Sequence, residues 1–292
     1  MFRLITRSAA ALCILLLISC GGGSTTPTLG IYVADAPIDD VNGVYIQITE
    51  IDVTGDNGTL YYPFNATTTI NFYGLQGGLS QFLLNVGVPE GHYTSITIHF
   101  QAAPGTFDSY ITLIGNNNVY PLVIPTGAPS VFTLPVSFVV IQNINAAYTI
   151  DLNLRSSILP DPTNPYQYIL RPVLYTINNN DQGSITGTVA TTLIPSGCSP
   201  TIYVYSGNVT PTDVNVNAPS GTVQPISSAL VGLNYTTAKY NFTVGWLPPG
   251  KYTVALTCEA NLDDPTTANN LTFTPIITAT VIANQTTYVD LN

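Results

Sequence analysis

Short runs of alternating apolar and polar residues recur about every ten residues along this chain, and they constrain its fold more than any other feature. Each run is bounded by glycine, proline, asparagine or aspartate, and no long segment shows the 3.6-residue periodicity of an amphipathic helix. Clear examples are residues 43–48, 94–100, 148–154, 202–205 and 252–258. Because strands that follow one another through short turns pair antiparallel, the pattern predicts an all-β protein made of antiparallel sandwiches.

A polar segment divides the chain into two parts. Residues 178–183, Asn-Asn-Asn-Asp-Gln-Gly, interrupt the strand pattern with residues that favour turns. Similar phrases, Val-Pro-Glu-Gly-His-Tyr at 88–93 and Leu-Pro-Pro-Gly-Lys-Tyr at 247–252, introduce an alternating run in each part. Such a turn is common in prealbumin-like sandwiches and carries no catalytic content. We expect two β-sandwich domains in tandem, at residues 29–178 and 183–292.

The N-terminus has the organisation of an export signal. Arg3 and Arg7 precede an apolar stretch, residues 9–17, that is too short to span a bilayer. The sequence Leu-Ile-Ser-Cys that ends at Cys20 resembles the lipobox of bacterial lipoproteins. The resemblance implies that residues 1–19 are removed and that Cys20 is acylated, which anchors the chain in membrane lipid. The alternative is an ordinary secretory signal with a chance cysteine.

Residues 20–28 follow as a tether rich in glycine, serine and threonine, and it is expected to lift the first domain from the lipid surface. The resemblance to a lipoprotein implies a membrane-anchored protein that faces the periplasm or the cell surface. Gly21, in place of aspartate after the cysteine, resembles the default for sorting to the outer membrane in diderm bacteria.

The charge of the chain excludes one class of partner. Without Arg3 and Arg7, four of the six basic residues remain against 16 acidic ones, a net charge of about −12. Nucleic acid is excluded as a partner, because its recognition requires clusters of basic residues that neutralise phosphates. Charged residues make up only 8% of the chain, so we also expect few ion pairs and tolerance of acid surroundings.

The cysteines predict one disulfide. Cys13 lies in the apolar part of the signal and Cys20 is the acylation site, which leaves Cys198 and Cys258 as a pair in an oxidising compartment. Both lie at the ends of predicted strands, where two sheets of a sandwich approach each other. The alternative is a pair of buried free thiols.

The sequence contains no recognisable catalytic constellation, and we expect a protein that is not an enzyme. Nucleophilic catalysis usually needs a histidine base, and only His92 and His99 are present. An odd spacing of seven residues on a strand predicts that they point to opposite faces, so we expect turn or surface positions for both. The single tryptophan, Trp246, is expected in the core.

Acidic residues provide the one candidate ligand site. Asp35, Asp39 and Asp40 crowd a single loop, and calcium binds six to eight oxygens, so this loop is a candidate Ca²⁺ site. Turn chemistry explains the same residues and is the favoured interpretation, because aspartate before Ala-Pro is typical of an Asx turn. Asp52 and Asp56 frame a predicted hairpin.

The two parts of the chain resemble two known domain families. Residues 29–178 resemble the DUF4382 domain in the opening Gly-Ile-Tyr-Val (30–33), the strand Val-Tyr-Ile-Gln-Ile-Thr (44–49) and the closing Ile-Leu-Arg-Pro-Val-Leu (169–174). That resemblance implies a β-sandwich of lipoproteins or secreted proteins with no assigned activity. Residues 183–292 resemble the carboxypeptidase regulatory-like, or transthyretin-like, domain, which implies a spacer or sugar-facing module. A long Pro/Asn-rich insert at 208–229 departs from that pattern.

We therefore expect a non-enzymatic lipoprotein that acts as a spacer and interaction module for a protein or glycan partner, with no cofactor. Two alternatives stay open. One is a carbohydrate-processing hydrolase that uses paired carboxylates. The other is a filament subunit that assembles by strand addition at sheet edges.

Overall fold

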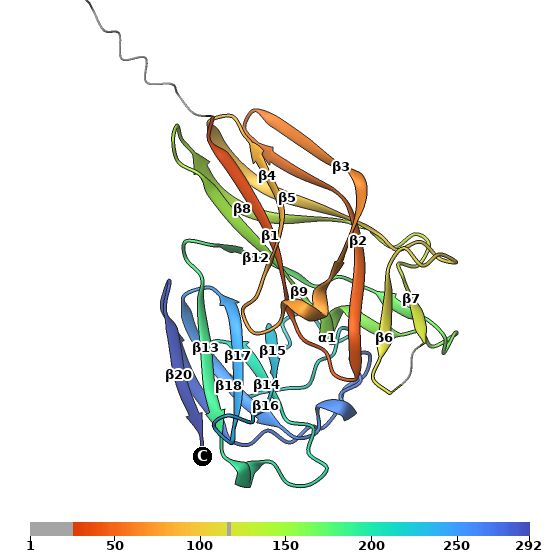
Figure 1. Cartoon of the computed structure of the whole chain (residues 1–292), viewed down its shortest axis with the longest axis vertical. Helices are drawn as coiled ribbons and strands as arrows, with labels where there is room; N and C mark the ends of the chain where they lie inside the picture. Colours follow the sequence, from red (N-terminus) through yellow and green to blue (C-terminus); the bar gives the residue numbers. More distant parts are fainter. Residues whose placement is uncertain (1–25, 116–117) are drawn as a thin grey trace, which may run out of the picture.

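The computed structural model describes residues 26–115 and 118–292, and within them nearly every regular element is a strand (Figure 1). The strands form two groups of sheets, one from residues 28–178 and one from residues 183–291, and no strand of one group pairs with a strand of the other in this part of the chain. These groups are called the first half and the second half below. The predicted all-β fold is confirmed.

The first half contains two sheets. The smaller sheet has the order β12-β9-β1-β4, with β1 (Thr28–Ala36), β4 (Gln81–Gly87), β9 (Ala146–Asn153) and β12 (Leu174–Asn178). The larger sheet has the order β10-β11-β7-β6-β2-β5-β8, and β3 also pairs with β2. Its strands are β2 (Val41–Gly55), β3 (Gly58–Asn71), β5 (Gly91–Gln101), β6 (Tyr110–Leu113), β7 (Val119–Val123), β8 (Val131–Val140), β10 (Ile158–Pro160) and β11 (Tyr168–Leu170).

The second half is a sandwich of two four-stranded sheets. One has the order β16-β17-β13-β20, with β13 (Gly183–Val189), β16 (Gly232–Asn234), β17 (Lys239–Leu247) and β20 (Thr286–Leu291). The other has the order β15-β14-β18-β19, with β14 (Thr201–Ser206), β15 (Ser227–Leu230), β18 (Gly250–Thr257) and β19 (Ile276–Val281).

The sheets are not wholly antiparallel. In each half the first strand has one antiparallel and one parallel neighbour: β1 pairs antiparallel with β4 and parallel with β9, and β13 pairs antiparallel with β17 and parallel with β20. Sequence alternation does not distinguish the two kinds of pairing, because both place successive side chains on opposite faces.

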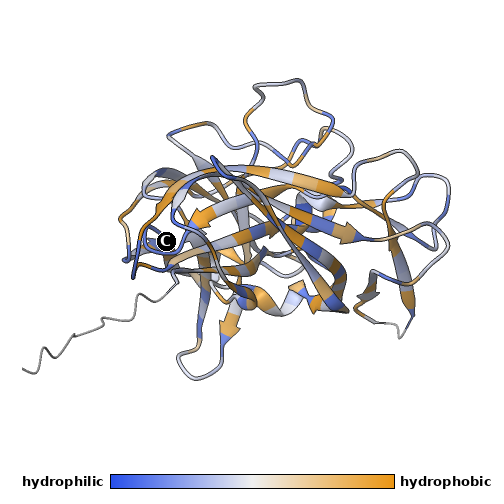
Figure 2. Ribbon diagram, turned by 90° about the horizontal axis from the view of Figure 1, so that it is seen from above, coloured by the Kyte–Doolittle hydropathy of each residue, from blue (hydrophilic) through white to orange (hydrophobic). Residues whose placement is uncertain are grey.

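Alternation along the strands builds the cores, and Figure 2 shows apolar and polar residues following one another along the ribbons. Ile31 and Val33 on β1 face Ile51 and Ile98 of the larger sheet in one buried cluster, and each is fully buried. Burying such a side chain contributes about 1.5–3 kcal/mol. Truncating Ile51 to alanine would therefore cost about 2–5 kcal/mol, because it also leaves a cavity.

Helices are few and short. The single α-helix of the described residues, α1 (Leu154–Ser157), begins where the Asn153 side chain accepts a hydrogen bond from the Ser156 backbone N–H at 3.2 Å. Three 3₁₀ turns complete the set: η1 (Phe72–Leu75), η2 (Thr191–Leu193) and η3 (Ala260–Leu262). None of the described helices has the length and apolar character needed to cross a membrane.

The N-terminal predictions fall largely outside the described residues. The signal at 1–19, the acylated Cys20 and most of the tether lie there, so they stay predictions. Thr28, the last residue of the predicted tether, is the first residue of β1, and the carbonyl of Pro27 accepts a hydrogen bond from the Val88 backbone N–H.

Candidate functional site

The two halves meet through polar contacts as well as packing. Ser228 of β15 donates a hydrogen bond from its hydroxyl to the Pro37 carbonyl at 2.9 Å. Asn153 donates from its amide to the Ile226 carbonyl at 3.3 Å. In Figure 1 this junction lies between the first half above and the second half below. The hydrogen bonds fix how the halves sit against each other.

Arg155 is the central side chain of the junction. Its guanidinium lies 2.6 Å from the Asp39 carboxylate, and only 5% of the side chain is exposed. From α1 of the first half it reaches the second half twice, 3.4 Å from the Ala260 carbonyl and 5.1 Å from the centre of the Tyr203 ring. A buried cation needs such compensation, because its removal from water is costly. Arg155 therefore links the halves through Ala260 and Tyr203, while its ion pair with Asp39 compensates its buried charge.

Tyr203 extends this network into the second half. Its hydroxyl donates a hydrogen bond to the Asp263 carboxylate, which also accepts one from the Val214 backbone N–H at 3.3 Å. Burial raises the pKa of the Tyr203 hydroxyl, and burial also raises the pKa of Asp263. The buried hydroxyl therefore stays protonated and acts as a hydrogen-bond donor.

A cleft of about 680 Å³ opens beside the junction. The first half lines it with Leu134, Pro135, Asp151 and residues 174–177; the second half lines it with residues 206–207, 226–227 and 246–252. Most of this lining is apolar or aromatic, with Tyr175 on one wall and Trp246 on the other. A concave surface of this size and composition, at a boundary between structural units, is typical of a ligand site.

Asp151 is the one carboxylate among the lining residues of this cleft. It lies on β9 directly opposite Tyr175 of β12, and only 5% of it is exposed. Burial raises its pKa to about 7. On the neighbouring strand β1, burial and the charge of Asp151 raise the pKa of Asp35 well above its usual value. Below neutral pH Asp151 is thus mostly protonated, and it ionises as the pH rises through about 7.

A β-bulge shapes the opposite wall. Trp246 adopts a left-handed backbone conformation (φ 54°), where the register between β13 and β17 shifts. Its indole N–H donates to the Leu79 carbonyl at 3.1 Å, which adds a contact between the halves. Gly245 beside it has no room for a side chain, because a Cβ would lie 2.3 Å from the Gly78 Cα. The bulge therefore turns Trp246 out of the core, where the sequence predicted it, and into the cleft wall.

The three aspartates of the candidate calcium loop have different surroundings. Asp39 is neutralised by Arg155, Asp35 is buried beside Asp151, and Asp40 ends the loop in a left-handed conformation (φ 60°). The three carboxylates do not form a group whose ligand atoms converge. Ca²⁺ binding at this loop therefore stays a candidate only, and the contacts of Asp39 and Asp35 agree with the favoured interpretation that these residues have a structural role.

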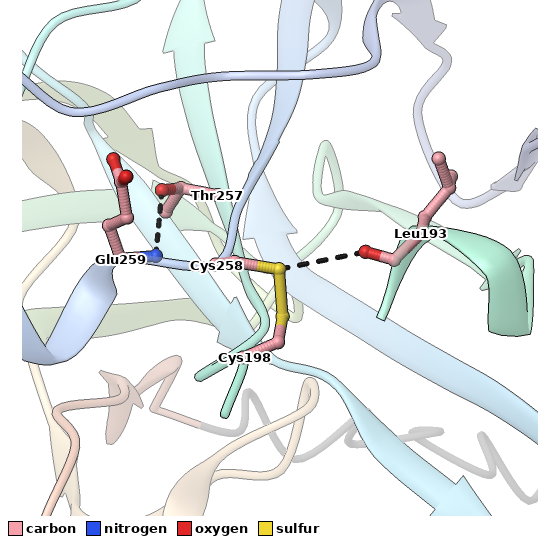
Figure 3. Close-up of a disulfide and its surroundings, with 5 residues drawn as sticks. All are labelled: Leu193, Cys198, Thr257, Cys258 and Glu259. Carbon is pink, nitrogen blue, oxygen red and sulfur yellow. Dashed lines mark hydrogen bonds between the residues drawn. A yellow bond between two sulfur atoms is a disulfide. The ribbon is translucent and has the colours of Figure 1, made fainter. Parts of the chain in front are cut away.

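The disulfide between Cys198 and Cys258 is present, as the sequence predicts (Figure 3). Cys258 follows the last residue of β18, and the Ser199 backbone N–H donates to the Cys258 carbonyl at 2.9 Å. The Cys258 sulfur also lies 3.6 Å from the Leu193 carbonyl oxygen. The bond closes a separation of 60 residues and fixes one end of the second sandwich.

The histidines do not lie on opposite faces. The register of β5 shifts between Tyr93 and Ser95, and the buried positions Tyr93 and Ile96 are three residues apart. This bulge moves the alternation by one residue, so His92 and His99 both lie away from the core. His99 is also not a plain surface residue, since its Nε2 lies 2.8 Å from the Asp52 carboxylate.

Three residues that matter at the site went unrecognised in the sequence. Arg155 and Asp151 both carry a detectable signal, because Asp151 lies in the middle of the alternating run 148–154 and Arg155 directly follows it, in a chain with very few charges. A charge in such a run is costly to bury and points to a special environment. Trp246 carries no comparable signal, because its position depends on the bulge.

One family model matches the chain, and it is described as a domain of unknown function, DUF4382. The match covers residues 26–172, half of the chain, and agrees with the resemblance seen in the sequence. It does not extend to the second half, whose resemblance to carboxypeptidase regulatory-like domains stays a prediction. A search of the curated proteins finds no relative of the chain.

Solved structures with some likeness to the chain include three bacterial proteins. The TIE protein of Bacillus anthracis has 10% identity and a TM-score of 0.21, and the match covers 91% of this chain and 33% of that one. A fimbrial anchor protein of Porphyromonas gingivalis has 9% identity and a TM-score of 0.18, with 81% and 80% covered. A minor pilin of Streptococcus agalactiae has 12% identity and a TM-score of 0.20, with 90% and 94% covered.

This chain thus spans about a third of the length of the Bacillus anthracis protein. At TM-scores near 0.2, none of these likenesses supports an inference about this chain.

Proposed function

The chain belongs to the DUF4382 family, and from that premise we propose that it is a non-enzymatic, membrane-anchored lipoprotein that acts as a spacer and as an interaction module for a protein or glycan partner. The observation that carries the proposal is the cleft between the two halves. The anchor would hold the chain at the membrane, and the two stacked halves would present the cleft at a distance from the lipid.

The chemistry of the cleft favours a neutral partner. Tyr175, which is 37% exposed, and Trp246 offer aromatic rings from opposite walls. Aromatic faces bind the apolar faces of sugars or of protein side chains, while their polar ends accept or donate hydrogen bonds. The acidic chain, with 16 acidic and six basic residues, repels anionic ligands.

The membrane anchor rests on the sequence around Cys20. Several acyl chains on one residue, each contributing about 0.8 kcal/mol per buried methylene, hold a protein permanently in lipid, whereas a single chain does not. The proposed outer-membrane location rests on the same sequence feature.

The cleft does not favour the hydrolase alternative. Glycoside hydrolysis uses two carboxylates that flank the scissile bond. Among the described residues Asp151 is the one carboxylate that lines the cleft, and Asp35 on the neighbouring strand is not part of the lining. The arrangement therefore supplies one acid to a bound sugar and lacks the second.

The proposal is tested by screening the purified chain on a glycan array and by recovering partners from envelope extracts. The decisive comparison uses Tyr175→Ala in the cleft and Tyr235→Ala as a matched control, since Tyr235 is 90% exposed and lies outside the cleft. We expect the cleft variant to lose a ligand that the wild type and the control both retain. Binding that survives in Tyr175→Ala, or hydrolysis of the bound glycan, would contradict the proposal. Size-exclusion chromatography of the same samples tests the filament alternative.

A further inference from the structure

A second group of polar side chains lies far from the cleft, on the larger sheet of the first half. Glu50, Asp52 and His99 each offer one metal-ligand atom, and these atoms all lie within 4.8 Å of one another. Glu50 and Asp52 are two residues apart on β2, and His99 lies opposite Glu50 on β5. Ile51 between the two acids is buried in the core. The three side chains therefore share the face of the sheet that points away from the core.

Asp52 provides independent evidence for a ligand at this group, because one of its carboxylate oxygens has no partner. Only 7% of the residue is exposed, although it lies on the outer face. Its Oδ2 is held 2.8 Å from the Nε2 of His99, while its Oδ1 is buried and has no hydrogen-bond partner. A buried carboxylate oxygen without a partner destabilises the folded state, because it has lost its hydrogen bonds to water and forms none with the protein.

The charge of the group is also not balanced by the protein. Neither Glu50 nor Asp52 forms an ion pair with a lysine or arginine in the part of the chain that the structure describes. The contrast with Asp39 is direct, because that buried carboxylate has Arg155. A protonated His99 would balance at most one of the two carboxylates, so a further cation is favoured here.

We propose that Glu50, Asp52 and His99 bind one first-row divalent metal ion of the Zn²⁺ type. An imidazole nitrogen with carboxylate oxygens is a donor set that suits Zn²⁺, whereas Ca²⁺ requires six to eight oxygens. Zinc bonds of about 2.0–2.2 Å in tetrahedral geometry place two ligand atoms about 3.3–3.6 Å apart. The half-exposed Glu50 closes the small remaining gap by rotation of its side chain.

Three protein ligands leave one position of a tetrahedral ion open. That position is available to water or to a side chain of a partner that docks on this face. The inference is independent of the cleft, and its failure would leave the proposed function unaffected.

Isothermal titration calorimetry with Zn²⁺ tests the site in the untagged, chelator-treated full chain. We expect one ion per chain, and a dissociation constant at least tenfold weaker in both Glu50→Gln and His99→Gln. His92→Gln is the matched control, because His92 lies 3.5 Å from Asp56 but in no group of three ligands. It should bind Zn²⁺ like the wild type, and Ca²⁺ should not compete.

Melting temperatures measured with and without Zn²⁺ provide a second test of the site. Zn²⁺ should raise the melting temperature of the wild type and of His92→Gln, because a ligand that binds only the folded state stabilises it. It should raise that of Glu50→Gln clearly less at the same Zn²⁺ concentration, and this variant of a half-exposed side chain is expected to fold. Absence of Zn²⁺ binding in the wild type, unchanged affinity in Glu50→Gln, or equal loss in His92→Gln would overturn the proposal.

Discussion

Arg155 lies with its guanidinium carbon 5.1 Å from the centre of the Tyr203 ring, so that a cation of the first half rests on an aromatic side chain of the second. The same guanidinium is paired with Asp39 at 2.6 Å. A cation over a ring that is removed from water contributes about 2 kcal/mol or more. The cleft beside this contact therefore has walls whose relative position is fixed.

Replacement of Arg155 by methionine should strongly destabilise the chain. The methionine retains much of the side-chain volume but leaves Asp39 buried without its partner, which costs about 3–5 kcal/mol. Arg155→Lys should recover part of the loss, since it keeps the charge but not the planar group over Tyr203. Urea unfolding measures the difference.

Arg171→Ala serves as the control for this experiment, because Arg171 is exposed, its side chain makes a long 3.5 Å contact with Asn217, and the variant keeps the backbone hydrogen bond to Ser157. Its free energy of unfolding should change by no more than about 0.5 kcal/mol. An equal effect of the two variants would show that the Arg155 network does not hold the halves together.

The chain should become less stable as the pH rises from 4.5 to 7.5. The pKa of Asp151 is about 7 in the folded state and near 3.8 when exposed, so between these values the folded state binds more protons than the unfolded state. The unfolding free energy therefore falls with pH in this window, by on the order of 4 kcal/mol in total. The raised pKa of Asp35 acts in the same direction. Unfolding midpoints across the range measure the slope.

Asp151→Asn isolates the contribution of Asp151 to this slope. The amide cannot ionise, so the decrease between pH 4.5 and 7.5 should become clearly smaller. The exposed Glu90→Gln should leave the slope as it is. A wild-type chain that is more stable at pH 7.5 than at pH 4.5 would refute the assignment of neutral buried acids at the cleft wall.

Loss of the disulfide should destabilise the second half. A loop of 60 residues stabilises the folded state by roughly 4 kcal/mol in the chain-entropy model. The double variant Cys198→Ser with Cys258→Ser should melt at a lower temperature than the oxidised wild type, and a reductant should lower the melting temperature of the wild type but not of the variant. Two free thiols in the unreduced, denatured wild type, beyond any at Cys20, would show that the bond does not form in the isolated protein.

Cys20→Ser should release the chain from its membrane. Acylation at the sulfur requires the cysteine, so the variant should show no incorporation of labelled fatty acid and should leave the membrane fraction of the host. Cys198→Ser should retain both properties, which separates loss of the anchor from a general effect of removing a thiol. Unchanged labelling of Cys20→Ser would exclude the lipoprotein assignment.

The local parts of this structure follow from the sequence. Alternation alone predicts strands at residues 94–100 and 252–258; the first run lies in β5, and the second lies in β18 except for Cys258, which directly follows that strand. The disulfide followed from counting cysteines in an exported chain. Each of these inferences uses residues that are close in the sequence, or a residue type with only one available partner.

The features that the sequence does not predict depend on contacts between residues that are far apart in the sequence. The pairing of Asp39 with Arg155 could not be predicted, because Arg155 lies more than a hundred residues away in the sequence. Two bulges, near Tyr93 and at Trp246, moved side chains to faces that strict alternation does not predict. A register shift is set by the pairing of whole strands and leaves little trace in a short run of residues.

Hydrogen exchange of the chain with and without its glycan or protein partner tests the central claim, that the cleft between the halves is the binding surface. The account predicts that backbone amides of residues 174–177 and 246–252 become protected when the partner is added. It also predicts no change along β20, at the outer edge of the second half. Protection confined to β20 or to other exposed edges, with the two cleft segments unchanged, would contradict it.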